Sequence, residues 1–402
     1  MIGNGCSNRQ RQNNGIIAAL FLFQYSLLVP FMKIFSLSFL LAVSGIVLVI
    51  AAFYVNRGIV FNIKVIILFF ALLIIFLLKN LIDGSEISVL IKFLMIAIPP
   101  VIVYSYQFDY DMFLKWSCIL SKANFLFLFL TPFSGERIAY MRFGYSMVLT
   151  VIFSYISVFH PDYVNPSGHN GYSKTSARII DIGILVVSVA ETIVFGSRGA
   201  LVVFVAFVFI DLLLIYKKRV LLNTTLMIAG FITLFNLEQI LSLVISLTAR
   251  FNINSYALNK YQYQLVYGLE EASSGRGRLY ATAWESIKEN LLFGTPMISY
   301  DEGELYTHNL FLQVGKDLGI IAMILMAFFV LYCLYLMYAK RLDKKEKSVL
   351  AVLFVMSVVR LLLSSNLWER PEFWMLVSFV LNYRTLTPEK RMQDEHLLIN
   401  QE

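Results

Sequence analysis

Five polar residues in three short segments have the right types to do chemistry at one site. Arg198 stands in a Gly-Ser-Arg-Gly turn, and Arg276 and Arg278 alternate with glycine in a later segment. His308 and Asn309 directly precede a long apolar run. Guanidinium groups are permanently charged and match phosphate oxygens in pairs, whereas an imidazole exchanges a proton near neutral pH. The set therefore predicts a site that binds a phosphate or diphosphate and moves a proton.

Each of these residues also has an ordinary interpretation when it is taken alone. Arg198 could anchor a helix end or pair with Glu191, as long cationic side chains often do. Arginines in a glycine-rich loop could simply be solvated, and a histidine before a helix could be a cap. The functional interpretation therefore depends on whether the surrounding elements bring these segments to one place.

Three further charges lie within apolar runs. Arg360 falls inside the run 348–366, and Lys316 and Asp317 fall about two turns into the run 309–338. Ionisable residues inside a membrane usually face a partner or a water-filled cavity, so we expect a cavity beside these runs. A second His-Asn pair, His169 and Asn170, lies in a Pro-, Gly- and Ser-containing linker, and we expect no role for it.

The elements that must carry these residues are membrane helices. The 402 residues are 58% hydrophobic and 15% charged, with a mean hydropathy of +0.72, whereas a soluble domain would be about a quarter charged. Runs long enough to cross a bilayer lie near 16–32, 34–54, 61–78, 88–104, 112–131, 140–159, 178–195, 199–216, 220–240, 309–338, 348–366 and 370–385. The sequence thus predicts an all-α integral membrane protein with about 12 transmembrane helices.

The distribution of Lys and Arg predicts the orientation. With a cytoplasmic N-terminus, most of the Lys and Arg of the short loops lie inside, as the positive-inside rule requires. This basic inner collar explains the net charge of +7, so we infer no nucleic-acid partner from it. The chain then divides into 1–240, with about nine transmembrane helices, an outer loop at 241–308, and 309–402, with about three more helices and a cytoplasmic tail.

The long loop has one helical signal of its own. Tyr280, Trp284, Ile287 and Leu291 recur at four-three-four spacing, which is the pattern of one apolar helix face. We therefore expect short helices in this loop, packed on the bundle or on the membrane surface.

The order of the outer segments resembles the O-antigen polymerase and O-antigen ligase superfamily, the Wzy/WaaL-type membrane glycosyltransferases. The matching segments are Gly196-Ser197-Arg198-Gly199-Ala200, Gly277-Arg278, Trp284, Pro296, Thr307-His308-Asn309-Leu310-Phe311-Leu312, Gly315, Leu318-Gly319-Ile320, Trp368, Pro371 and Phe373-Trp374. The chain departs from the usual pattern at the second arginine, where Arg276 and Arg278 are both candidates. Its glycine-rich element before the histidine is interrupted by Asp301, Glu302 and Glu304.

This resemblance implies an enzyme of the bacterial inner membrane whose active site faces the periplasm, so that the outer loop is periplasmic. His308 would be the general base, and Arg198, with Arg278 or Arg276, would bind the diphosphate of the donor. Asn309, next to His308, and the intramembrane charge Arg360 are further predicted substrate-binding residues, and no metal and no cofactor are expected. The implied partners are an undecaprenyl-diphosphate-linked oligosaccharide, the lipid bilayer and, as an open option, a chain-length regulator.

Three alternatives differ in what the site does. An O-antigen polymerase transfers the glycan to a lipid-linked repeat unit, and we favour it because such sequences are numerous. An O-antigen ligase would transfer the glycan to lipid A–core instead. A flippase or other transporter would usually show internal repeats with matching broken helices, whereas only the fourth run is broken, at Pro99-Pro100.

Overall fold

The computed structural model describes residues 7–31, 37–58, 62–131, 140–163, 174–215, 237–251, 255–267, 276–298, 307–339 and 342–382. Secondary structure in these ranges is helical, with no strand. The elements of the first half are α1 (Asn8–Leu28), η1 (Val29–Phe31), α2 (Leu37–Asn56), α3 (Ile63–Asp83), α4 (Ile87–Ser105), α5 (Tyr110–Phe129), α6 (Tyr140–Phe159), η3 (Pro161–Tyr163), α7 (Lys174–Phe195), α8 (Arg198–Ile210) and the π-helix η4 (Asp211–Ile215).

The second half begins with three short helices in the predicted outer loop. Its elements are α10 (Leu237–Arg250), α11 (Tyr256–Tyr267), α13 (Arg276–Glu289), α14 (Leu310–Leu318), α15 (Ile320–Tyr338), α16 (Lys344–Phe354), the π-helix η5 (Val355–Val359), α17 (Arg360–Leu363), η6 (Leu367–Glu369) and α18 (Pro371–Asn382). The prediction of short helices in this loop is confirmed by α11 and α13. In α13, however, the most deeply buried residues are Ala283 and Ile287, whereas Trp284 is 41% exposed.

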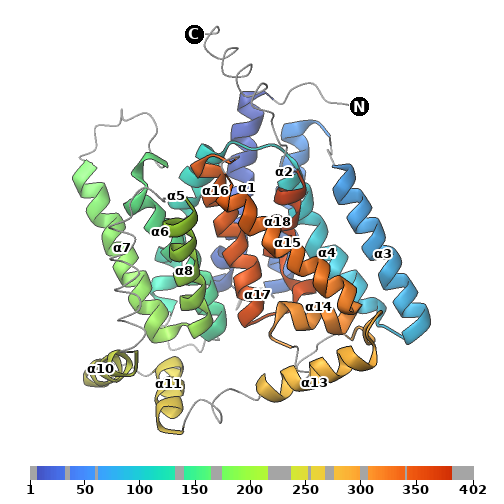
Figure 1. Ribbon diagram of the computed structural model, residues 1–402. Helices are drawn as coiled ribbons and strands as arrows, with labels where there is room; N and C mark the ends of the chain where they lie inside the picture. The colour runs from blue at the N-terminus through green and yellow to red at the C-terminus, as the bar shows by residue number, and fades with distance from the viewer. Residues whose placement is uncertain are drawn as a thin grey trace.

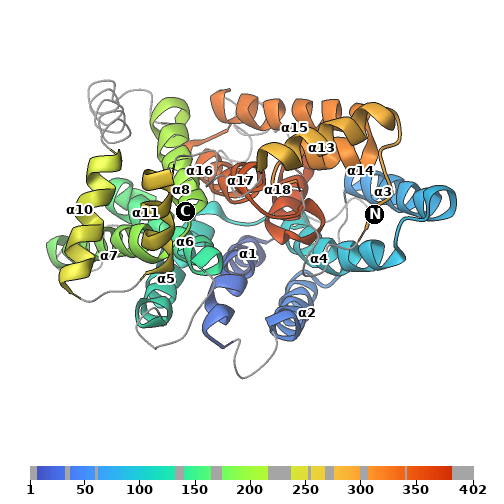
Figure 2. The ribbon, with the colours of Figure 1, turned by 90° about the horizontal axis from the view of Figure 1, so that it is seen from below.

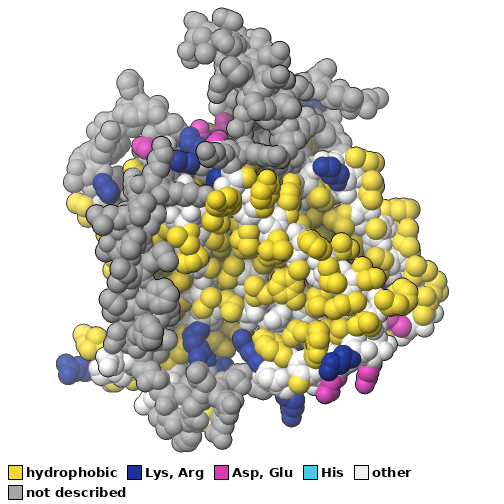
Figure 3. Space-filling view, in the orientation of Figure 1, with side chains coloured by type: hydrophobic (Ala, Val, Ile, Leu, Met, Phe, Trp, Pro, Cys, Tyr) yellow, Lys and Arg dark blue, Asp and Glu magenta, His cyan; other side chains and the backbone are white. Residues whose placement is uncertain are grey.

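Eight helices in the described ranges are long and apolar enough to cross a membrane, fewer than the dozen runs predicted. They are α1 with η1, α2, α3, α4, α5, α6, α8 with η4, and α15. Helix α7 is also long, but Arg178, Asp181 and Glu191 make it more polar. The run 220–240 lies almost entirely outside the described residues. The protein is therefore a multi-pass membrane protein, and exposed apolar side chains cover the middle of the face seen in Figure 3.

The predicted span 309–338 is wrong as a single helix. The chain breaks at Gly319, whose φ of 86° and ψ of 176° are open to glycine but not to other residues. The backbone N–H of Ile320 then donates to the carbonyl of Leu291 over 2.8 Å. Lys316 and Asp317 consequently lie in the short helix α14 and not inside a span.

The two ends of the bundle are distinct. At one end, Asn62 at the start of α3 donates to the carbonyl of Leu381 in α18 over 3.0 Å, and Arg11 in α1 donates to Gln107 over 3.3 Å. The start of α1 and the end of α18 meet at this end, because Asn382 of α18 donates to Ser105 over 3.3 Å and Asn14 of α1 donates to the carbonyl of Gln107 over 2.9 Å. Helices α10, α11, α13 and α14 lie at the opposite end (Figure 1).

Candidate active site

Arg198 begins α8 directly after a tight turn. Ser197 caps this helix by accepting a hydrogen bond from the N–H of Ala200 over 3.3 Å. The turn packs closely on α6, because a Cβ at Gly144 would lie only 2.6 Å from the backbone nitrogen of Ser197. The sharp link between α7 and α8 therefore fixes the position of Arg198 at the end of the bundle that carries the short helices.

The guanidinium of Arg198 lies over the ring of Tyr261 in α11, 5.2 Å from the ring centroid. Burial raises the pKa of Tyr261 to about 12, so the phenol is neutral and its ring face attracts the cation. Glu191, the alternative partner, is 6% exposed, and neither of its carboxylate oxygens has a hydrogen-bond partner in the described part of the chain. Arg198 itself remains exposed, so the structure places its charge where a ligand can reach it.

His308 and Asn309 stand at the start of α14. The Asn309 side chain caps this helix by accepting hydrogen bonds from the N–H groups of Phe311 and Leu312, over 3.0 and 3.2 Å. His308 precedes the cap with a φ of 52°, a left-handed conformation that residues other than glycine seldom adopt and that often marks functional positions. Asn309 therefore has a structural role in orienting the half-buried imidazole.

The protonation state of His308 suits a base. Burial, and to a smaller extent the positive charge of Arg276, lower the pKa of His308 to about 4. The imidazole is therefore neutral at neutral pH and has a lone pair with which to accept a proton.

The two candidates for the second arginine differ in their surroundings. Arg276 begins α13 and is half-buried, close enough to His308 for its charge to act on the imidazole. Arg278 is exposed, two residues further along α13. The structure thus brings Arg276, and not Arg278, into electrostatic contact with His308.

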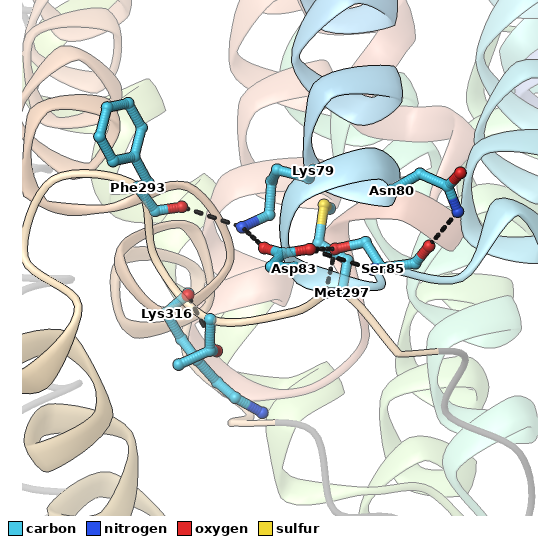
Figure 4. A network of polar contacts seen from close by, with 8 residues as sticks. Lys79, Asn80, Asp83, Ser85, Phe293, Met297 and Lys316 are labelled. Atoms are coloured by element: carbon cyan, nitrogen blue, oxygen red, sulfur yellow. Dashed lines mark hydrogen bonds and ion pairs between the residues drawn. The ribbon is translucent and has the colours of Figure 1, made fainter.

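The segment that follows α13 is fixed to the turn between α3 and α4 (Figure 4). Lys79 is paired with Asp83 over 2.7 Å and also donates to the carbonyl of Phe293 over 3.0 Å. The Ser85 hydroxyl donates to Asp83 over 2.6 Å and accepts from the N–H of Met297 over 2.8 Å. Because Lys79 is buried, these bonds are shielded from water and hold the end of α13 in place.

The same segment is also joined to α14. The N–H of Thr295 donates to the carbonyl of Lys316 over 2.7 Å. Gly294 has a φ of +70°, and a Cβ there would collide with that carbonyl. Ile287 of α13 packs against Gly315 of α14. Helices α13 and α14, which carry Arg276 and His308, are therefore one rigid pair, seen from their end of the bundle in Figure 2.

A buried polar network attaches α14 to the chain between α17 and α18. Gln313 donates to the side chain of Asn366 and accepts from the N–H of Leu367, the latter over 3.1 Å. The indole N–H of Trp368 donates to Asp317 over 2.8 Å. Gln313 and Asp317 are one helical turn apart and nearly fully buried, so they fix one whole face of α14.

Arg360 lies beneath the Arg198 turn. It is 2% exposed, donates to Glu372 of α18 over 2.7 Å, and lies over the ring of Tyr145 at 4.3 Å. Tyr145 also contacts the Arg198 turn, because a Cβ at Gly199 would collide with the Tyr145 hydroxyl. Arg360 therefore has an acidic partner, Glu372, as expected of a charge inside the membrane. The Arg198 turn, α17 and α14 form one continuous set of contacts.

Several residues of this region escaped sequence reasoning. Nothing local in the sequence pairs Glu372 with Arg360 or Tyr261 with Arg198, because each pair joins separate helices. In the sequence, Trp368 stands out only as part of a family motif, and nothing local predicts its bond to Asp317. His169 and Asn170, and the acidic Asp301, Glu302 and Glu304, lie outside the described residues. In the ranges that the structure describes, no three His, Cys, Asp or Glu side chains are grouped as metal ligands would be.

Comparison with known proteins identifies one family. Residues 183–327 match the Wzy_C family model, described as O-Antigen ligase. The matched segment contains Arg198, Arg276, Arg278 and His308, and it ends before Arg360. No curated protein and no solved structure matches the chain. Residues 183–327 of this multi-pass membrane protein therefore match a family of membrane enzymes of the O-antigen ligase and polymerase type, which transfer lipid-linked glycans.

Proposed function

We propose that the protein is an O-antigen polymerase of the bacterial inner membrane. It transfers a glycan from undecaprenyl diphosphate to a hydroxyl of a lipid-linked repeat unit on the periplasmic side. The observation that carries this proposal is the position of His308, a neutral imidazole beside Arg276 at the same end of the bundle as Arg198. A base next to permanent cations is what glycosyl transfer from a diphosphate needs.

The reaction assigns a role to each side chain. The acceptor hydroxyl oxygen attacks the anomeric carbon of the donor, and the bond from that carbon to the diphosphate oxygen breaks. His308 takes the hydroxyl proton. Arg198 and Arg276 stabilise the negative charge that develops on the leaving diphosphate, since preorganised cations are most effective where charge builds up. Arg278, on the exposed face of α13, assists in attracting the anion, and no metal takes part in this scheme.

The test of catalysis is a His308→Ala variant in a strain that lacks its own copy. We expect the variant to insert at the normal level and to make no long polysaccharide, because the acceptor proton has no base to receive it. The measurement is the chain-length distribution of the surface polysaccharide on a gel. A normal distribution from a stably inserted variant would exclude His308 as the base.

The O-antigen ligase is the second candidate, favoured by the description of the family model. Purified protein supplied with lipid-linked repeat units, with and without lipid A–core, separates the two. A polymerase lengthens the lipid-linked product without core, whereas a ligase forms product only when core is present.

A further inference from the structure

A second group of cations lies beside the proposed catalytic site, where α17 passes into α18. Arg360 is paired with Glu372. Arg370 is close enough to Arg360 for their two positive charges to repel each other. Two guanidinium groups and one carboxylate leave one positive charge in excess. Arg370 has no ion pair within the described residues, so this excess is not neutralised there.

The group also contains buried polar atoms that lack partners. Arg360 Nε, Arg370 Nε and Glu372 Oε2 are all buried and make no hydrogen bond in the part of the chain that the structure describes. Buried polar atoms are nearly always satisfied by protein, water or ligand. Two of these three atoms are guanidinium donors, which suit an anion.

The backbone around the group is also unusual. The π-helix η5 (Val355–Val359) directly precedes Arg360, and π-helical turns often occur at functional positions. Ser365, just beyond α17, has a φ of 87°. Arg370 is only partly buried, so an anion can reach it from the end of the bundle, with Arg360 behind it.

The group meets α14 on the face opposite to α13. Gln313 and Asp317, which bond to the segment 366–368, lie on one face of α14. Gly315, which packs against Ile287 of α13, lies two residues from each and so on the opposite face. Arg276 and Arg370 therefore belong to structures that flank α14, and with it His308, from two sides.

We propose that Arg360 and Arg370 form a second anion site, which holds the diphosphate of the acceptor lipid while the donor diphosphate lies at Arg198 and Arg276. Glu372 holds Arg360 in place in the absence of ligand. The proposal rests on the proposed polymerase function, because only transfer between two lipid-linked substrates brings two diphosphates to one site. Separate cation sites then keep these like charges apart.

Steady-state kinetics of Arg370→Gln in purified full-length protein test the proposal. With saturating donor, we expect the KM for the lipid-linked acceptor to rise about 10- to 100-fold, the loss that follows removal of a charge-assisted hydrogen bond. The kcat and the KM for the donor should change little. Lys288→Gln, which removes an exposed cation from α13, is the matched control and should leave both KM values unchanged. A rise in the KM for the donor, or no change in either, would overturn the assignment.

Binding measured without turnover separates this proposal from the catalytic one. The tryptophan fluorescence of His308→Ala should respond to the lipid-linked unit through Trp368, which lies two residues before Arg370 and bonds to α14, and the response should be lost on adding Arg370→Gln. Should His308→Ala prove active, catalysis by His308 fails while the acceptor KM still reports on Arg370. An equal response to vesicles of phosphatidylglycerol would show a bilayer-lipid site and overturn the proposal.

Variants that keep or raise the charge distinguish ligand binding from folding. Arg370→Lys retains the positive charge but loses the paired donors of the guanidinium. Its KM for the acceptor should lie between those of the unmodified protein and Arg370→Gln. Glu372→Gln removes the counter-ion of Arg360 and so frees its charge for the ligand. The KM for the acceptor should therefore fall. Loss of thermal stability in both variants with an unchanged acceptor KM would show that the group is only structural.

Discussion

At the scale of the residue, the environment of His308 sets what this side chain can do in the proposed reaction. Burial and the charge of Arg276 hold the pKa of His308 near 4, so the imidazole is a weak base that is always available at neutral pH. A weak base suits a reaction in which the diphosphate departs early, because the hydroxyl proton becomes acidic only as its oxygen bonds to the anomeric carbon. The same arginine would then neutralise the departing group.

The pH dependence of Arg276→Gln tests this coupling. In the unmodified protein we expect kcat/KM to fall as the pH decreases through about 4, where His308 becomes protonated and can no longer accept a proton. Removing the positive charge makes protonation easier, so the pKa rises and the acid limb should move up by roughly 1 pH unit. Arg278→Gln is the control, with a smaller shift. Equal shifts in both variants would contradict a specific role for Arg276.

At the scale of the element, α14 is positioned by contacts on all sides rather than by its own stability. It is nine residues long, which is too short to be stable alone. Its start is capped by Asn309, one face bonds to the segment 366–368, and the other packs on α13. Its end is set by the break at Gly319. Precise placement of His308 therefore depends on residues remote from it.

Gly319→Ala should damage both folding and activity. A Cβ at this position would collide with the carbonyl of Leu292, and the backbone conformation, which is open to glycine, would cost another residue about 1–3 kcal/mol. We expect a lower thermal midpoint in detergent and a transfer rate reduced at least in proportion. Gly183→Ala in α7, where a Cβ meets nothing within 4 Å, should be neutral or slightly stabilising. Equal midpoints for the two variants would show that the break does not require glycine.

At the scale of the whole molecule, the bundle separates its two ends. At one end of the bundle, the start of α1, the start of α3 and the end of α18 are hydrogen-bonded to neighbouring segments. The elements that carry Arg198, Arg276, His308 and Arg360 meet at or near the other end. The proposed function requires the second end to face the periplasm, where lipid-linked glycans are joined. Charge distribution favours that orientation.

Cysteine labelling checks the orientation. Lys288→Cys in α13 should react with a membrane-impermeant maleimide added outside the inner membrane, whereas Arg11→Cys should react only after lysis. Cys118 and Cys333 are buried free thiols and should stay unreactive, and Cys6→Ser removes the remaining thiol. The reverse labelling pattern would place the site in the cytoplasm and exclude the proposed reaction.

The sequence by itself determined the membrane class and most of the helices, and it supplied the polar residues of the proposed site. Long apolar runs and the glycine turn before Arg198 are local features, and the bilayer allows few other outcomes for such runs. The ordered motifs around Arg198, Arg278 and His308 also led to the family that the comparison identified.

Only the tertiary structure decided which residues meet. It replaced one predicted span by α14 and α15, brought Arg276 rather than Arg278 to His308, and gave Arg360 its partner Glu372. The physical reason is that burial and charge act through space. Hydrophobic periodicity reports one helix at a time, whereas the pKa of His308 and the excess charge at Arg370 arise where helices distant in sequence pack together.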